Sequence, residues 1–448
     1  MAFTLIKNGR VLDPETGFDK VADIVIENDK IVAIEEDLSL EMFGDNIEED
    51  DSSNVQFDAN GCFVMPAFID LHVHFRDPGQ EEKETIRTGA RAAARGGYST
   101  VCMMPNTKPC IDSVETITDV IDKVRNETYV KALPLAAMTA NQDGDYITDV
   151  ASLKANGAIA MSEDGKSVMN TRVARQAFKL AADNDMPVFD HCEDIDLRKR
   201  GVMNAGPRAK ELGLYGILNA VEDTITARDI ILAKDTGCHL HLCHVSTVGV
   251  VKMLDFAKKE GIHITAEVTP HHLILTDEDV DGTDSDFKMN PPLRSREDRE
   301  ALIKALADGT IDCIATDHAP HTEEEKAAGF KEAPFGITGL ETAAPLIYTE
   351  LVEKGVLTPL QMAEKMSYNP ARILRFEKAG RLQVGASADV TIFDPQAEYE
   401  IDSSKFFSKG KNTPFEGRHV KGSVRATFID GRLVYSNHNG HEVLIEKG

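Results

Sequence analysis

The stretch "FIDLHVHFRDPG", residues 68–79, decides how the chain is expected to fold. It opens as a short apolar run typical of a buried β-strand and ends in two histidines, His72 and His74, one residue apart. Because side chains alternate along a strand, these two imidazoles share one face. Arg76 follows two residues later, so we expect it to point the same way from the strand end.

Similar apolar runs recur through the middle of the chain, and they are "STVCMMPN", "VKALPLAAM", "AIAMSED", "PVFDH", "HLHLCH", "HITAEVTPHH" and "DCIATDH". Between the runs lie segments of helical character that end in Gly, Asn or Asp, such as "ETIRTGARAAARGG", "VARQAFKLAADND", "EDTITARDIILAKDTG" and "REALIKALADG". Eight β–α alternations within about 250 residues predict an α/β fold, a (β/α)8 TIM-like barrel.

The two flanks predict a second, smaller domain. Both carry strand-like runs joined by Asn-Gly or Asp-Gly turns, which favour β-hairpins. We therefore expect a small β-sandwich domain built from residues 1–65 and 373–448, with the barrel over 66–372. The acidic stretch 35–54 is expected to be a solvated loop. Residues 321–336 follow the eighth strand directly, where a barrel carries its active-site loops.

Composition restricts the partners and the compartment. The formal net charge of −26 opposes non-specific attraction to nucleic acid or to an anionic membrane. No apolar run approaches the roughly 18 residues of a membrane-spanning helix, and the start of the chain lacks the features of an export signal. We expect a cytoplasmic protein that binds neither nucleic acid nor membrane.

The seven cysteines are an odd number, form no Cys-x-x-Cys pair and lie mostly in apolar runs, which predicts buried, reduced thiols. Cys192 and Cys243 adjoin His191 and His244, so a soft metal site remains an alternative. Neighbouring residues of a strand point to opposite faces, which argues against it.

Nearly every barrel run ends in a group able to bind a metal or a substrate, and together these are His72, His74, Asn106, Asp164, His191, His244 and Asp317. In a barrel these strand ends converge on one rim. Four imidazoles and two carboxylates suit Zn²⁺ or a similar divalent ion, and they exceed the four ligands of one tetrahedral zinc. Two metals that share a carboxylate would use all six. Such a pair activates water and polarises a carbonyl, which predicts hydrolysis at a carbonyl.

A structural role is the alternative for each residue taken alone. We expect it to hold for five further histidines of the barrel, which are His239, His241, His263, His271 and His272. Asp164, before a glycine, alone would read as a helix cap, and Asp317 alone would fit either role. The joint pattern favours a site, because independent core histidines have no reason to sit at four strand ends.

Several motifs together resemble the amidohydrolase superfamily, and specifically the type I dihydroorotases of pyrimidine biosynthesis: "DLHVHFRDPG", "MMPNTKP", "HCED", "CHVST", "AEVTPHHL", "KMNPPLRS", "ATDHAPH" and "APFGITGLET". The resemblance spans essentially the whole chain. It implies reversible hydrolysis of L-dihydroorotate to N-carbamoyl-L-aspartate, with ring closure in the biosynthetic direction.

The resemblance also implies two Zn²⁺ ions. His72, His74 and Asp317 would hold one, His191 and His244 the other, and Asp164 would bridge them. The family's "DDG" motif here reads "SEDG", with Glu163 in place of the first aspartate. Many superfamily members bridge with a carboxylated lysine instead, so Lys154 or Lys166 stays an alternative. The same ligands also accept Co²⁺ or Mn²⁺.

The resemblance assigns the binding of the substrate to Arg76, Asn106 and His321. Contacts to the ring would come from His74, Asn290 and the backbone at Phe335 and Gly336. An arginine fork suits a carboxylate, and asparagine suits ring amides. Asp317 would serve as the catalytic acid and base as well as a ligand.

Two alternatives to a dihydroorotase remain open. One is a related cyclic amidase, such as a dihydropyrimidinase or allantoinase, although those usually carry the lysine bridge and act on rings without this carboxylate. The other is an inactive, dihydroorotase-like partner of aspartate carbamoyltransferase. All six ligand positions keep ligand-competent residues, which disfavours that reading. A homodimer is the common expectation for the family, and association with the transferase is compatible with activity.

Overall fold

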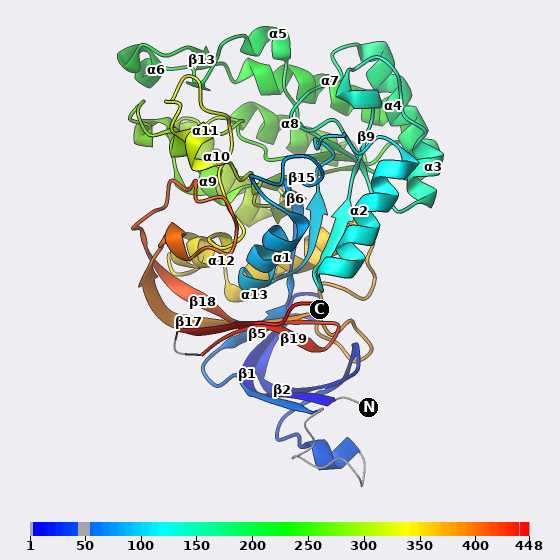
Figure 1. Ribbon diagram of the computed structural model, residues 1–448, viewed down its shortest axis with the longest axis vertical. Helices are drawn as coiled ribbons and strands as arrows, with labels where there is room; N and C mark the ends of the chain where they lie inside the picture. Colours follow the sequence, from blue (N-terminus) through cyan, green and yellow to red (C-terminus); the bar gives the residue numbers. More distant parts are fainter. Residues whose placement is uncertain (1–2, 44–53, 439, 448) are drawn as a thin grey trace.

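The computed structural model describes residues 3–43, 54–438 and 440–447, so half of the acidic stretch 35–54, residues 44–53, lies outside the described residues. A barrel with an outer layer of helices stands on a sheet that contains strands from both ends of the chain (Figure 1). Of that acidic stretch, Leu40–Phe43 form a single 3-10 turn, η1, with Leu40 buried. Among the described residues, no helix combines the length and apolar character needed to cross a membrane.

The barrel strands are parallel and belong to a three-stranded and a six-stranded sheet. The first contains β6 (Phe68–Val73), β7 (Tyr98–Met103) and β8 (Lys131–Pro134); the second contains β9 (Ala136–Ala137), β10 (Met161–Ser162), β11 (Val188–Asp190), β14 (Leu240–Leu242), β15 (Ile264–Val268) and β16 (Cys313–Ile314). Only Leu135 separates β8 from β9, so the two act as one strand. The circle closes where His74 N donates to His318 O at 2.8 Å. All eight runs expected to form strands therefore take part.

Helices cover the outside of the barrel, and the longer ones are α1 (Ile86–Arg95), α2 (Val114–Glu127), α4 (Thr171–Asp183), α7 (Ala220–Thr236), α8 (Val248–Lys259) and α10 (Arg296–Asp308). A side-chain oxygen caps the start of each of these helices except α7, as where Ser295 accepts from Asp298 N. Gly237 and Gly309 end α7 and α10 at φ of 74° and 85°, the left-handed conformation that glycine adopts without strain. The four segments expected to be helical lie on α1, α4, α7 and α10.

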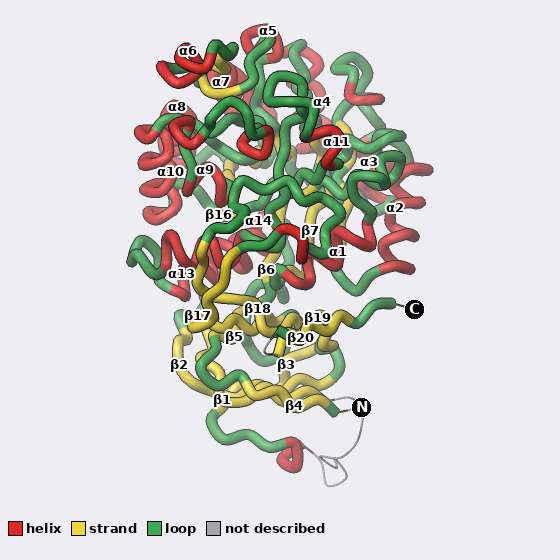
Figure 2. Tube along the Cα trace, turned by 60° about the vertical axis from the view of Figure 1, so that its left-hand side comes forward, coloured by secondary structure: helices red, strands yellow, loops and turns green. Residues whose placement is uncertain are grey.

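The terminal sheet has nine strands and runs β20-β19-β18-β17-β5-β1-β2-β3, with β4 paired to β1 (Figure 2). Its strands are β1 (Phe3–Asp13), β2 (Phe18–Glu27), β3 (Lys30–Glu35), β4 (Val55–Asp58), β5 (Phe63–Pro66), β17 (Val390–Glu400), β18 (His419–Ile429), β19 (Arg432–His438) and β20 (His441–Leu444). The two chain ends join where β5 pairs with β17, Val64 opposite Ile392. The domain boundaries at 65/66 and 372/373 stay a prediction.

Two buried threonines of the terminal sheet hold it against the barrel. Thr391 Oγ1 donates to Gly97 O at 2.6 Å, and Thr427 Oγ1 donates to Ala94 O at 2.7 Å, both near the end of α1. We expect the double change Thr391→Val and Thr427→Val to lower the free energy of unfolding by about 2 kcal/mol, since each lost hydrogen bond costs about 1 kcal/mol.

Urea unfolding would measure this effect. Thr118→Val is the matched control, because this exposed hydroxyl bonds only within its own helix and its loss should change stability by less than about 0.5 kcal/mol. Equal stability of the double variant and the control would show that these bonds do not hold the sheet in place.

Candidate active site

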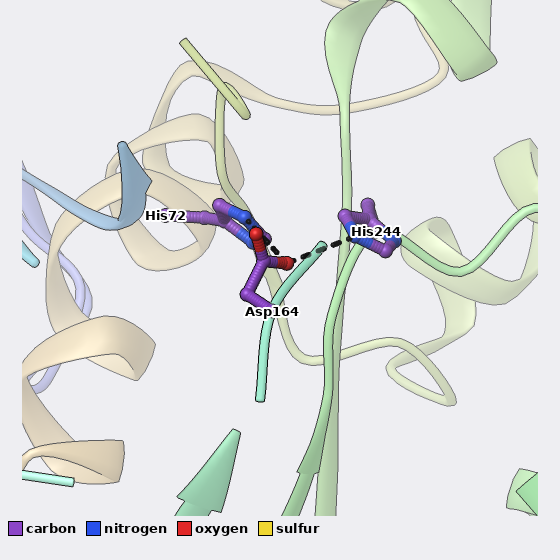
Figure 3. A group of neighbouring side chains, drawn as sticks. All are labelled: His72, Asp164 and His244. Carbon is purple, nitrogen blue, oxygen red and sulfur yellow. Dashed lines mark ion pairs between the residues drawn. The ribbon is translucent and has the colours of Figure 1, made fainter. Parts of the chain in front are cut away.

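The predicted ligands meet at the carboxyl ends of the barrel strands. His72 is the next-to-last residue of β6 and His74 comes directly after it, while Asp164, His191, His244 and Asp317 come one to three residues after β10, β11, β14 and β16. His72 and His244 point toward Asp164 from opposite sides (Figure 3). All six side chains are buried. The structure thus brings together every residue expected to bind metal.

Asp164 lies at the centre of the group. Its Oδ1 is 3.3 Å from His72 Nε2, 3.6 Å from His191 Nδ1 and 3.7 Å from His244 Nε2. Its Oδ2 is 3.4 Å from His74 Nε2. One carboxylate therefore reaches all four imidazoles, as a bridging ligand must.

Asp317 approaches the same group from β16. Its Oδ1 is 3.1 Å from His74 Nε2 and 3.5 Å from His72 Nε2. Burial opposes ionisation of Asp317, but the charge on His72 and the hydrogen bond from His74 outweigh it and hold the pKa of this carboxyl well below its usual range. The group is therefore an anion at neutral pH, ready to accept a proton or to bind a cation.

Three buried polar atoms at the centre have no hydrogen-bond partner among the described residues: His72 Nε2, Asp164 Oδ1 and His244 Nδ1. A buried polar atom without a partner is costly, and a bound cation would satisfy acceptors of this kind. Two groups of the expected ligands have ligand atoms within 4.8 Å of one another, namely His72, Asp164 and His244, and His72, His74 and Asp317. The donor set fits divalent metal. His191 joins it through His244 Nε2, 2.9 Å from its Nδ1.

Glu267 was not anticipated as part of the site. It lies fully buried on β15, and its Oε1 is 2.9 Å from His72 Nδ1 and accepts from His244 N at 3.2 Å. Its Oε2 is 3.0 Å from His241 Nε2. By accepting a hydrogen bond from the Nδ1–H of His72, this carboxylate favours the tautomer whose Nε2 lone pair faces Asp164. The only sequence signal was an acidic residue inside the apolar run "TAEVT".

We expect Glu267→Gln to weaken metal binding by roughly 10–100-fold, because an amide no longer fixes the tautomer of His72. Competition with a chromogenic chelator would measure the affinity. Glu260→Gln, on the exposed end of α8, is the matched control. An affinity for metal equal to that of the control would remove Glu267 from the site.

The expected substrate residues border the same centre. A cavity of about 170 Å³ is lined by His74, Arg76, Asn106, Asp164, His191, His244, Asn290, Asp317, Phe335 and Gly336, and also by Glu193 and Arg198. His321 stands behind it, with its Nε2 3.3 Å from Arg76 Nη2 and 2.9 Å from Phe335 O. The predicted metal and substrate groups therefore share one space. Glu193 and Arg198 were missed by the sequence reasoning.

The segment 321–336 is held down from two directions. Buried Lys326, on the short helix α11 (Glu323–Lys326), donates to Gly336 O at 3.0 Å and to Pro334 O at 3.3 Å. Asn412, from the terminal segment, donates to Gly336 O at 3.0 Å and accepts from His321 N at 3.1 Å. The backbone that faces the cavity is thus held by Lys326 within the segment and by Asn412 from the C-terminal part of the chain.

The lysines, the other histidines and the cysteines that were alternatives for the site make different contacts. Lys154 and Lys166 are exposed and bond to backbone carbonyl oxygens, Lys154 to Asp185 O and Lys166 to Asn141 O. His239 stacks on His263 with ring centroids 4.0 Å apart. All seven cysteines are free, and Cys110 alone is not fully buried. Cys243 and Cys192 do lie near potential ligands, in the groups His72, Cys243, Glu267 and Asp190, Cys192, Asp229.

Comparison with known proteins places the chain in a family. The family model described as "Dihydro-orotase-like" matches residues 61–249. The dihydroorotase of Geobacillus sp. (strain WCH70) is 48% identical, over 96% of this chain and 98% of the relative. The dihydroorotase of Halalkalibacterium halodurans is also 48% identical, with the same two coverages. The chain belongs to the dihydroorotase family.

Solved structures agree with the family on the fold. The L-hydantoinase (dihydropyrimidinase) from Arthrobacter aurescens matches with a TM-score of 0.86 and 26% identity, over 100% of this chain and 98% of that one. A D-hydantoinase from Thermus sp. matches with a TM-score of 0.84 and 26% identity, over 99% and 97%. The predicted barrel with a β-sandwich from the termini is confirmed. A dihydroorotase-family chain of this fold is a cyclic amidohydrolase, and the superfamily is metal-dependent.

Proposed function

We propose that this dihydroorotase-family chain hydrolyses L-dihydroorotate reversibly to N-carbamoyl-L-aspartate, the ring-closing direction serving pyrimidine biosynthesis in the cytoplasm. The observation that carries the proposal is the shared cavity: Arg76, able to pair with a carboxylate, lines the same space as the His and Asp cluster. An uncharged ring carries no carboxylate with which a guanidinium at this position could pair.

Two Zn²⁺ ions fit the ligand set, with Co²⁺ or Mn²⁺ as possible substitutes. His72, His74 and Asp317 would hold one ion, His191 and His244 the other, and Asp164 both. When bound, such a pair activates water and polarises a carbonyl oxygen. Glu267, through His72, fixes the imidazole that points at Asp164.

The chain's own residues orient the ring and move the proton. Arg76, Asn106 and His321 hold the substrate carboxylate, while His74, Asn290 and the backbone at Phe335 and Gly336 contact the ring. Asp317 accepts the proton of the attacking water at a carboxylate oxygen and delivers it to the departing ring nitrogen. Ring closure runs the same steps in reverse.

The test is ultraviolet monitoring of L-dihydroorotate ring opening by the purified protein, as isolated, after chelation and after Zn²⁺ is added back. Hydantoin, dihydrouracil and allantoin serve as comparison substrates, because the structural neighbours include hydantoinases. Metal-dependent opening of dihydroorotate alone supports the proposal. Turnover of the uncharged rings would move the substrate to another cyclic amide, and no turnover of any ring by metal-loaded protein would support the assembly-partner alternative.

Assembly is a separate part of the proposal. We expect a homodimer, with association with aspartate carbamoyltransferase as a further possibility compatible with catalysis. Sedimentation of the chain alone and mixed with the transferase would test both.

A further inference from the structure

We propose that Glu193 is a positioning residue that sets substrate specificity by fixing the side-chain amide of Asn290. Glu193 is 4% exposed and lines the cavity. Its Oε1 accepts from Asn290 Nδ2 at 3.0 Å and lies 2.8 Å from Arg198 Nε. This inference deepens the proposed function and rests on it, since it names the hydrogen-bonding pattern that the same site selects.

Glu193 is fixed at its backbone as well as at its carboxylate. Its N–H donates to Ser167 Oγ at 3.2 Å, and Ser167 Oγ in turn donates to His191 O at 2.9 Å. Asp194 caps the short helix α5 (Ile195–Arg198), whose single turn brings Arg198 back beside Glu193. These contacts fix the position of the Glu193 carboxylate. The orientation of the Asn290 side-chain amide is therefore set by the carboxylate.

The amide of Asn290 then has only one favourable orientation. A carboxylate accepts hydrogen bonds and a guanidinium donates them, so the group facing Glu193 Oε1 must be the NH₂ of Asn290. Its Oδ1 is left to face the cavity that Asn290 lines. Within the described part of the chain, no donor is hydrogen-bonded to that oxygen. The site consequently presents a hydrogen-bond acceptor to the substrate.

The ring of dihydroorotate carries two N–H groups. The nitrogen that departs is assigned to Asp317, so the other N–H, next to the carbon that bears the carboxylate, pairs with Asn290 Oδ1. The ligand class that fits is a cyclic ureide with an N–H at this position. A ring with an oxygen atom there would place two acceptors against each other and be rejected, because a site built around one hydrogen bond discriminates against an analogue that cannot form it.

Glu193→Gln tests this directly, because a glutamine can present either its oxygen or its NH₂ and so lets Asn290 turn. The measurement is the ratio of kcat/KM for L-dihydroorotate to kcat/KM for the analogue in which a ring oxygen replaces that N–H. A ratio within one protein is independent of the fraction of active, metal-loaded enzyme. We expect the wild-type ratio to fall by about tenfold or more in the variant.

A double variant separates orientation from a merely structural loss. In Glu193→Gln with Asn290→Asp, glutamine donates to the new carboxylate, whose other oxygen again faces the cavity as an acceptor. We expect the ratio to return to within about threefold of wild type. Glu211→Gln, on the exposed side of the helix α6 (Pro207–Leu212), is the matched control and should keep the wild-type ratio.

Failure of the inference and failure of the proposed function give different results. Wild-type protein that does not open dihydroorotate contradicts the function itself. If wild type opens dihydroorotate but the ratio is unchanged in Glu193→Gln, or if the double variant does not restore it, Glu193 does not set the orientation of Asn290.

Discussion

Replacing Asp317 with asparagine is expected to lower kcat for dihydroorotate hydrolysis by roughly 10³-fold while the protein stays folded. Asparagine keeps the size of the side chain but cannot accept a proton at the position 3.1 Å from His74 Nε2. The low pKa of Asp317 makes the wild-type group an anion throughout the neutral range. The loss therefore reflects missing proton transfer and a missing negative ligand, which steady-state kinetics and metal analysis measure separately.

The matched control is Asp255→Asn, which removes a half-exposed carboxylate paired with Lys259 on α8. Exposed pairs of this kind contribute little to stability, so the control should keep wild-type activity and metal content. An Asp317→Asn variant that retained kcat within about tenfold of this control would assign the proton transfer to another group.

Much of the barrel could be predicted because its signals are local. Each buried parallel strand is a short apolar run, and each long helix has a capping side chain at its start, such as Ser295 before α10, or an end signal, such as Gly237 after α7. The segment 195–218, which connects β11 to α7, lacked such signals. It contains only short elements, α5, α6 and the two-residue strands β12 (Met203–Asn204) and β13 (Gly216–Ile217). Its structure depends on contacts that no short window of sequence encodes.

The site residues that were predicted have local signals in the sequence, whereas the missed ones depend on contacts between distant segments. The proposed ligands lie at or just beyond the ends of strands, where the barrel topology alone brings them together. Glu267 acts on His72, 195 residues away, and Asn412 reaches His321 across 91 residues. Glu267 is the next-to-last residue of β15, but a single glutamate in a strand does not reveal its partners, and Asn412 lies in a segment without regular secondary structure. Only the packed structure shows which of them support the site.

Changing Arg76 to methionine should have the second largest effect, a fall in kcat/KM for dihydroorotate of roughly 10²–10³-fold, mostly through KM. The guanidinium lines the cavity and is anchored by its Nε, which donates to Pro320 O at 3.3 Å. Methionine preserves the apolar stem and removes the charge that we propose to pair with the substrate carboxylate. The ligand cluster is left in place, so metal content should not change.

The decisive comparison for Arg76 is between charged and uncharged rings. If the guanidinium serves only the carboxylate, Arg76→Met should leave any residual turnover of dihydrouracil unchanged, and the preference for dihydroorotate should shrink by the same roughly 10²–10³-fold. Arg125→Met, an exposed arginine on α2, controls for the loss of a positive charge. An equal fall for both rings would mean that Arg76 supports the site's structure and does not recognise the carboxylate. The charge argument that separates this chain from amidases of neutral rings would then fail.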